Sequence, residues 1–221
     1  MRHNPQTARA RSESTTADPV VVELNARAPQ PRVASSDYAA FLLEFLRYPA
    51  QIGSVVPSSR FLERRLVQAT DAANARTIVE LGPGTGGTTR ALLRALRPDA
   101  RLLAIDLSPS FCARLGTAVH DPRLLVQRGS AEYIETFLRI ARLPRPDAIL
   151  SGIPFSTMPP AVADRIARAI AAALAPGGRF VAYQLRAHVA GYAAPYLGAP
   201  QKRWEWRNVP PMRVFTWTRA I

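Results

Sequence analysis

The chain has 221 residues, 48% of them hydrophobic, and carries a formal net charge of +13 at pH 7. This length suits a single domain with a full core, and the hydrophobic share excludes a wholly disordered protein. No run of eighteen apolar residues occurs, and residues 1–36 lack the apolar centre of a signal peptide. We therefore expect neither a transmembrane segment nor a secretory leader.

The charge comes from 29 basic residues against 16 acidic ones, and Lys202 is the only lysine. Such a balance predicts an anionic partner, either nucleic acid or an acidic lipid surface, although an arginine-rich coding bias would give the same count. Cys112 is the only cysteine, which excludes an internal disulfide and suits a reducing cytoplasm.

The amino-terminal part divides into two segments. Residues 1–36 mix Arg, Ser, Thr, Ala and Pro without periodicity and predict a disordered basic tail ahead of a folded domain at 37–221. Residues 37–48 predict an amphipathic helix whose apolar face includes Phe41, Leu42 and Phe45. This face could insert at a membrane interface or pack on the domain, and the pattern leaves both possibilities open.

The most informative stretch is Ile78–Thr89, which predicts a buried strand, a glycine-rich turn and the start of a helix. Gly82, Gly84 and Gly86 remove every Cβ that would hold a ligand away from the backbone, and they permit dihedral angles that other residues avoid. One tight turn needs one glycine, and this turn has four. The stretch therefore predicts a cofactor cradle.

Two cofactor classes use such a cradle, because Gly82, Gly84 and Gly87 also satisfy the dinucleotide pattern G-x-G-x-x-G. Glu80 favours S-adenosylmethionine, since a carboxylate would repel a pyrophosphate but can accept hydrogen bonds from an ammonium group. Pro83 points the same way, because it removes a backbone N–H that a phosphate would use. A nucleotide-dependent oxidoreductase is the less favoured alternative, since no hydride-site residues are visible.

Apolar runs and helical patterns alternate along the rest of the chain. They predict strands at 78–81, 102–106, 124–127, 148–150 and 180–183, with helices at 60–67, 91–96, 108–119, 131–140 and 160–174. This alternation predicts a parallel sheet covered by helices on both faces. Ligands of such sheets bind at the carboxyl ends of the strands, where Glu80, Asp106, Ser130 and Ser151 fall. Asp106 lies where a carboxylate can bind both ribose hydroxyls.

The segment Glu80-Leu-Gly-Pro-Gly-Thr-Gly resembles motif I of the class I S-adenosylmethionine-dependent methyltransferases. The resemblance implies a Rossmann-like, mostly parallel, doubly wound sheet of seven strands, with S-adenosylmethionine as the cofactor. The cofactor-binding residues that we predict on this basis are Ser58, Glu80, Gly82, Gly84, Gly86, Asp106, Leu107, Ser130, Ala131 and Ser151. Many of these enzymes place an acid for the adenine amine where this chain has Ser130.

The fourth strand runs into Ser151-Gly152-Ile153-Pro154-Phe155, at the position of the loop that faces the methyl group in this class. Methyltransferases of base nitrogens carry Asn or Asp there, then Pro and an aromatic residue, whereas Ser151 and Gly152 replace the polar member. An alkyl amine needs no such group, so we predict an amine acceptor passing Ile153 and Pro154. Phe155 would stabilise the methylated cation through its ring, or only cap the cofactor pocket.

Two further residues are candidates for handling the amine. Tyr183, at the end of the fifth strand, could bond to the amine, although a buried strand tyrosine would also fit the pattern. His188 is a candidate base in a loop. Neither pattern identifies a general base.

Several segments together are similar to the bacterial phospholipid N-methyltransferases; they are Pro57-Ser-Ser-Arg60, Ser151-Gly-Ile-Pro154 and Trp206-Arg-Asn-Val-Pro-Pro211. The resemblance implies stepwise methylation of phosphatidylethanolamine towards phosphatidylcholine by a cytoplasmic enzyme held peripherally at the inner face of the cell membrane. Phe155-Ser-Thr-Met158 departs from the family pattern, which leaves an ornithine lipid or another amine open.

The carboxyl-terminal segment adds a candidate lipid contact. Arg207, Asn208 and Arg213, with Trp204 and Trp206, could hold a lipid phosphate at headgroup level, or they could belong to an ordinary antiparallel strand pair. Two alternatives to lipid methylation remain. One is an rRNA adenine N6-methyltransferase, which the missing Asn or Asp disfavours, and the other is a membrane-binding protein with a silent cofactor fold.

Overall fold

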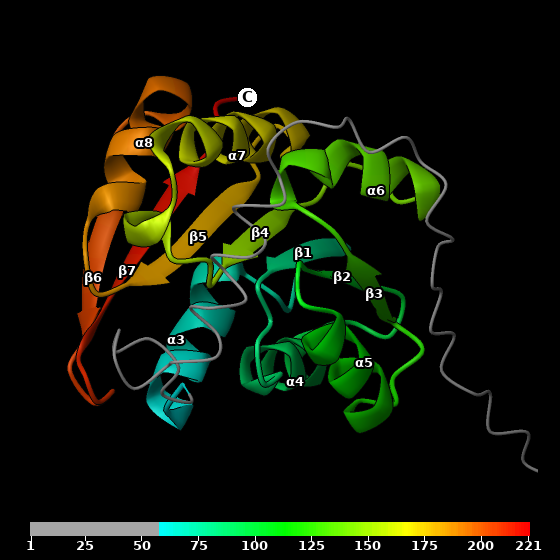
Figure 1. Cartoon of the computed structure of the whole chain (residues 1–221). Coiled ribbons are helices and arrows are strands. Elements are labelled where there is room, and N and C mark those ends of the chain that lie inside the picture. Colours follow the sequence, from blue (N-terminus) through cyan, green and yellow to red (C-terminus); the bar gives the residue numbers. More distant parts are fainter. Residues whose placement is uncertain (1–57) are drawn as a thin grey trace, which may run out of the picture.

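The computed structural model describes residues 58–221, which form a seven-stranded sheet in the order β3-β2-β1-β4-β5-β7-β6 (Figure 1). The five strands from β3 to β5 are parallel, while β7 runs antiparallel to both β5 and β6. This is the Rossmann-like sheet that the sequence predicted. The strands are β1 Thr77–Leu81, β2 Arg101–Asp106, β3 Leu124–Arg128, β4 Ala148–Ser151, β5 Arg179–Gln184, β6 Gln201–Glu205 and β7 Met212–Thr218.

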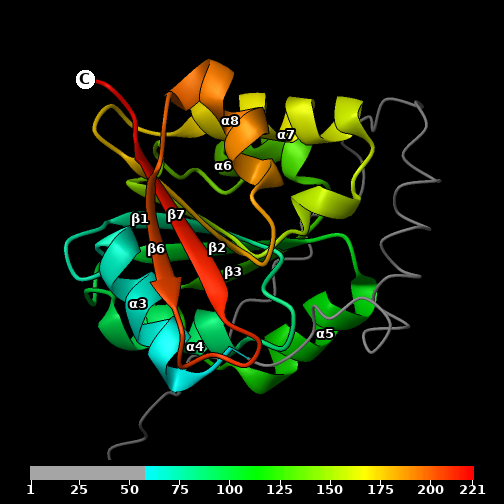
Figure 2. The same cartoon turned by 90° about the vertical axis from the view of Figure 1, so that its left-hand side faces the viewer.

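Helices cover both faces of the sheet, with α3, α4 and α5 on one side and α6, α7 and α8 on the other (Figures 1 and 2). Ser59 caps α3 and Ser108 caps α5, each hydroxyl accepting a hydrogen bond from the first helical turn. The helices are α3 Arg60–Thr70, α4 Gly87–Ala95, α5 Pro109–Ala118, α6 Ile134–Ile140, α7 Pro160–Ala173 and α8 His188–Leu197, with short 3₁₀ turns η1 Ala131–Tyr133 and η2 Phe155–Thr157.

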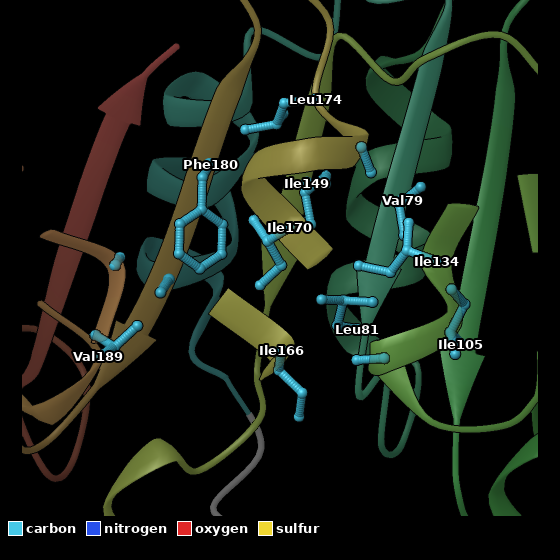
Figure 3. Close-up of a cluster of buried hydrophobic side chains, with 14 of the residues drawn as sticks. Val79, Leu81, Ile105, Ile134, Ile149, Ile166, Ile170, Leu174, Phe180 and Val189 are labelled. Carbon is cyan, nitrogen blue, oxygen red and sulfur yellow. The ribbon is translucent and has the colours of Figure 1, made fainter. Parts of the chain in front are cut away.

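The core lies in two apolar layers, one on each face of the sheet. Figure 3 shows the layer under α6, α7 and α8, to which β1 contributes Val79 and Leu81. Ile78 packs into the opposite layer, against α3 and α4. Successive strand residues point to opposite faces, so Glu80 lies on the α3–α5 side of the sheet. An acid in the middle of a fully buried strand is costly, which marks Glu80 as a residue with a specific role.

Two sequence predictions need correction. His188, predicted in a loop, is the first residue of α8, a helix that the sequence analysis did not anticipate. Its segment is apolar on most sides and contains Gly191 and Pro195, so it has no clear helical period. The predicted helix over 131–140 divides into η1 and α6.

The predicted tail 1–36 and the predicted helix 37–48, with Phe41, Leu42 and Phe45, lie outside the described residues. From residue 58 onward, no helix combines the length and the apolar character needed to cross a bilayer.

Candidate cofactor and acceptor site

The site lies where the strand order reverses, between β1 and its neighbours β2 and β4. Parallel pairing brings the carboxyl ends of β1, β2, β4 and β5 to one edge of the sheet. Glu80, Asp106, Ser151 and Tyr183 stand at these ends, on four different strands. The structure therefore gathers the strand-end residues that the sequence predicted.

The glycine turn after β1 is built from left-handed backbone conformations. Gly82, Gly84 and Gly86 have φ values of 71°, 55° and 80°, which L side chains rarely adopt. A Cβ added to Gly84 would have no heavy atom within 4 Å, so this stretch of backbone faces open space. A Cβ on Gly86 would lie 2.7 Å from Leu115 Cδ1, so that glycine is needed for packing. The open backbone at Gly84 fits a cofactor lying against the main chain.

The Glu80 carboxyl group lies inside the turn and is 1% exposed. One oxygen accepts a hydrogen bond from Thr88 Oγ1, and the other accepts one from Thr89 Oγ1 at 2.6 Å. Burial raises the pKa of Glu80 to about 7, although these two hydrogen bonds act to lower it. Glu80 thus anchors the first turn of α4, and the direct contact with a ligand ammonium group stays a prediction.

Asp106 ends β2 beside the glycine turn. Its Oδ1 accepts a hydrogen bond from the Ser108 backbone N–H at 2.8 Å, and the backbone N–H groups of Gly84 and Leu107 lie near the carboxylate and act to lower its pKa. Burial is the main cause that raises its pKa to about 6. A carboxylate in contact with the open Gly84 backbone fits recognition of ribose hydroxyls.

The adenine side, after β3, is formed by Ser130 and Ala131. Ser130 Oγ accepts a hydrogen bond from the Glu132 N–H at 3.3 Å, so it caps η1, and Ala131 is buried. The sequence analysis noted a missing acid here, but Glu132 lies two residues further on and pairs with Arg165 of α7. Glu132 is an additional candidate for the adenine amine, and the sequence analysis missed it because it lies two residues beyond the expected position.

The acceptor loop after β4, residues 152–155, is fixed by hydrogen bonds from neighbouring residues. Ser151 is fully buried, and its Oγ accepts a hydrogen bond from the Ile153 N–H at 3.3 Å. Gln184 Nε2 donates to Ile153 O at 2.6 Å, a contact that the sequence analysis missed. Pro154 O accepts from the Thr157 N–H, which closes η2. The loop is thus fixed at both ends, with Ile153 and Pro154 half-buried between them.

Tyr183 approaches this loop from β5. A Cβ added to Gly152 would lie only 2.7 Å from Tyr183 Oη. The side chains of Ser58 and Thr88 lie beside the phenol and act to lower its pKa. Burial, followed by the charge of Glu80, raises the pKa of Tyr183 to about 12. The hydroxyl groups of Ser58, Tyr183 and Thr88 therefore lie together, and Thr88 links this group to Glu80.

Phe155 does not take the position that the sequence predicted. Its side chain is 1% exposed and lies in the core, with its ring centroid 6.3 Å from that of Tyr192 on α8. The turn η2 directs the ring inward, toward a helix that the sequence analysis had not foreseen. Its predicted cation contact is therefore not formed in this arrangement.

Asn208 also needs correction, because it is 3% exposed. Its Oδ1 accepts a hydrogen bond from the Ser59 N–H at 2.9 Å, and its Nδ2 donates to Pro210 O at 2.8 Å. The side chain thus joins the β6–β7 turn to the start of α3 and is not open to a substrate.

The two arginines that the sequence analysis predicted as lipid contacts, Arg207 and Arg213, lie in different surroundings from Asn208. Arg207 is exposed beside Glu205, whereas Arg213 lies over the Trp204 ring.

The comparisons with known proteins show the family and the fold. A family model described as a methyltransferase domain matches residues 78–178, which run from β1 to the start of β5. The solved structure of a Burkholderia thailandensis 1,6-didemethyltoxoflavin-N1-methyltransferase, which holds S-adenosylhomocysteine, superposes with a TM-score of 0.63. It is 18% identical, and the match covers 93% of this chain and all of that one. The likeness shows the fold.

A curated relative gives a more specific match. An ornithine lipid N-methyltransferase from Singulisphaera acidiphila is 30% identical over 145 residues, which are 65% of this chain and 76% of the relative. The chain therefore belongs to the class I S-adenosylmethionine-dependent methyltransferases, and S-adenosylmethionine is its cofactor.

A second group of relatives acts on RNA. Ribosomal RNA small subunit methyltransferase A from Corynebacterium jeikeium is 29% identical over 104 residues, or 44% of this chain. The match spans about a third of that relative, 32% of its length.

Proposed function

We propose that this enzyme transfers a methyl group from S-adenosylmethionine to the amino group of a membrane lipid. The observation that carries the proposal is the acceptor site, in which Gly152 and Tyr183 replace the side chain that base-methylating enzymes carry. The lipid relative from Singulisphaera supports an ornithine lipid as the acceptor. Phosphatidylethanolamine, which the sequence resemblance favoured, presents the same primary ammonium group and is the second candidate.

S-adenosylmethionine supplies a methyl group on a positively charged sulfur, already activated for displacement. The protein therefore has to bind, orient and desolvate the two reactants. Gly84 offers open backbone, Asp106 offers a carboxylate for hydroxyl groups, and the Glu80 carboxyl group holds Thr88 and Thr89 beside the turn. These three groups stand at the ends of β1 and β2, so they fix the cofactor side of the site.

The acceptor side has one polar group aimed at the loop, the Tyr183 hydroxyl. The Thr88 hydroxyl donates to Glu80, and the oxygen of the nearby Tyr183 hydroxyl can accept a hydrogen bond from an amine N–H. A pKa of about 12 keeps this hydroxyl protonated at neutral pH, so Tyr183 positions the amine and is not its base. An alkyl amine needs only such positioning once it has lost its proton.

The alternative acceptor is an adenine of RNA, which the charge and the ribosomal RNA relatives favour. An adenine amine is conjugated with its ring, so its methylation needs a side-chain acceptor at the position of Gly152. The Tyr183 hydroxyl leaves no room there even for a Cβ. The side chain that adenine methylation would need at position 152 is therefore excluded by Tyr183. An alkyl amine does not need that side chain, so a lipid amine fits the site better.

The test supplies isotope-labelled S-adenosylmethionine with three acceptors, offered separately. These are anionic vesicles containing an ornithine lipid, anionic vesicles containing phosphatidylethanolamine, and ribosomal RNA. We expect label in one or both lipids and none with Asp106→Ala, the control for cofactor-dependent transfer. Label in RNA alone would reject the proposal.

We also propose that the enzyme works peripherally at the inner face of the cell membrane, where anionic lipids meet its positive charge. Vesicle sedimentation at low and high salt tests this location. Binding that neither requires anionic lipid nor weakens with salt would contradict it.

A further inference from the structure

One surface of the described domain combines exposed apolar and basic side chains. Trp206 is 68% exposed, Val209 is 79% exposed and Trp204 is 38% exposed, all within six residues at the β6–β7 turn. Phe61 of α3 lies next to them, because the Arg207 guanidinium sits 4.3 Å from its ring centroid. We call Phe61, Trp204, Trp206, Arg207 and Val209 the tryptophan surface.

Glu205 and Asn208 are buried and paired, so they fix the frame that carries this surface. Glu205 is 2% exposed and binds Arg65 at 2.8 Å, and it also accepts a hydrogen bond from the Arg207 backbone N–H. Asn208 ties the turn to Ser59. Exposure of three large apolar side chains, Trp204, Trp206 and Val209, on a braced turn costs solvation energy, which indicates a surface that is covered in use.

The tryptophan surface stands beside the acceptor site. Strand β7 is antiparallel to β5 and pairs Arg213 with Gln184, so the β6–β7 turn lies at the carboxyl edge of the sheet. Figure 2 shows this turn beside α3. Asn208 accepts a hydrogen bond from the Ser59 N–H, and the side chain of the preceding residue, Ser58, lies beside the Tyr183 hydroxyl. Two neighbouring residues thus separate the surface from the Tyr183 hydroxyl.

The charge around this surface is positive. Arg60, Lys202, Arg203 and Arg207 are exposed, while the acid among them, Glu205, is buried against Arg65 and Arg207. Indole and guanidinium groups together suit the headgroup region of an anionic bilayer, where the ring enters the interface and the cation meets phosphate.

A nucleic acid would also meet positive charge and aromatic rings, but it would stack bases on free ring faces. Trp204 and Trp206 stack on one another, with centroids 4.8 Å apart. The Arg213 guanidinium lies 4.6 Å from the Trp204 centroid, so this indole already contacts both Arg213 and Trp206. The exposed aliphatic Val209 adds nothing for a base, whereas it suits acyl chains.

We propose that the tryptophan surface docks on an anionic lipid bilayer and brings the carboxyl edge of the sheet against the headgroups. The docking itself is independent of the proposed function. The consequence, that a lipid amine reaches Tyr183 without leaving the interface, rests on the proposed function.

The first experiment measures tryptophan fluorescence of the full chain with anionic vesicles whose acyl chains carry bromine, which quenches only indoles that enter the bilayer. We expect quenching with the parent chain and its loss in the double variant Trp204→Phe, Trp206→Phe. That variant keeps Trp217, which is 1% exposed and serves as the internal control. A parent chain that is not quenched would overturn the docking, whether or not the chain binds the vesicles through residues 1–57.

The second experiment compares the double variant Trp206→Ser, Val209→Ser with a control variant, Ile140→Ser. The control removes an exposed apolar side chain from α6, away from the tryptophan surface. We expect the first pair to lower methylation of vesicle-embedded lipid about tenfold and Ile140→Ser to leave it unchanged, because only the pair loses apolar area at the interface. With a short-chain amino lipid that is dispersed in solution, both the double variant and Ile140→Ser should methylate at the rate of the parent. Equal rates for the pair and the parent on vesicles would contradict the docking.

Two further outcomes separate the hypotheses. Quenching without transfer to any lipid would reject the proposed function and retain the docking. Quenching of the tryptophans by ribosomal RNA, together with none by brominated vesicles, would reject the bilayer and identify the surface as an RNA contact.

Discussion

Tyr183 Oη occupies the place that a side chain on Gly152 would need, since an added Cβ would lie 2.7 Å from that oxygen. A glycine after β4 and a tyrosine at the end of β5 are therefore two parts of one acceptor site. The hydroxyl reaches the acceptor loop from a neighbouring strand, so the loop itself needs no polar side chain.

Tyr183→Phe should lower the rate of methyl transfer about 10- to 100-fold, because the hydrogen bond that positions the amine is lost. Calorimetric binding of S-adenosylmethionine should stay within about twofold of the parent, since Glu80, Asp106 and the glycine turn are unchanged. Tyr196→Phe is the matched control, because its hydroxyl binds Asp164 on α7, away from the site. Equal transfer rates in Tyr183→Phe and the parent would reject the positioning role.

Gly152→Ala should destabilise the protein by about 1–3 kcal/mol, since the methyl group displaces the Tyr183 hydroxyl. In a Tyr183→Ala background, Gly152→Ala should lower the free energy of unfolding by less, because the Tyr183 hydroxyl that the new methyl group would contact is absent. Urea unfolding of the four proteins in this cycle gives the coupling between the two positions. Strictly additive losses would mean that the two residues do not compete for space.

Much of this arrangement could be predicted from the sequence, because it depends on local patterns. Short apolar runs bounded by turn residues predicted five parallel strands, and a site at their carboxyl ends followed from the alternation with helices. Glu80 and Asp106 were located in this way. The glycine turn was also predicted from the sequence, because its glycines are closely spaced. The structure shows that three of them, Gly82, Gly84 and Gly86, have left-handed backbone conformations.

The remaining features depend on contacts between residues far apart in the chain. Asn208 binds Ser59 across 149 residues, and no local pattern distinguishes such an amide from a surface one. Phe155 resembled a residue facing the substrate because its orientation depends on η2 and on α8, a helix without a clear apolar period. The partner of Gly152 could not be read from its own loop.

The stability of the protein should depend on the protonation of Glu80. Burial raises the pKa of this carboxyl group from an ordinary 4.5 to about 7, so between these values the folded state binds more protons than the unfolded state. The stabilisation is complete below pH 4.5 and is lost as the pH rises through 7. Its full size is about 3 kcal/mol, from the difference between the two pKa values.

Glu80→Gln removes this titration, so its free energy of unfolding should rise relative to the parent between pH 5 and pH 8. Asp106 titrates in both proteins, and because its charge helps to raise the pKa of Glu80, the measured difference includes the coupling between the two carboxyl groups. Guanidinium unfolding at pH 5, 6, 7 and 8 measures the difference, with the exposed Glu135→Gln as the control for lost charge. A difference that does not vary with pH would contradict the raised pKa.

Asp106→Asn should weaken S-adenosylmethionine binding about 10- to 100-fold, because charge-assisted hydrogen bonds to the ribose hydroxyls become neutral ones. The amide oxygen can still accept from the Ser108 N–H, so the fold should persist. Titration calorimetry measures the affinity, and Asp99→Asn on the exposed loop before β2 is the control. If Asp106→Asn bound S-adenosylmethionine as tightly as the parent, the predicted contact between this carboxylate and the ribose would be wrong.

Asn208→Ala should destabilise the protein by about 1–3 kcal/mol, because the Ser59 N–H and Pro210 O lose their partner. The effect should extend to the tryptophan surface, since the same amide braces the β6–β7 turn that carries Trp206 and Val209. Asn74→Ala removes an exposed amide that binds only Asp71, and it should change the free energy of unfolding little. Urea unfolding gives both values, and amide hydrogen exchange reports the turn separately. If Asn208→Ala left unfolding and exchange at 205–211 unchanged, the amide would not be the brace, and its assignment as a substrate contact would be open again.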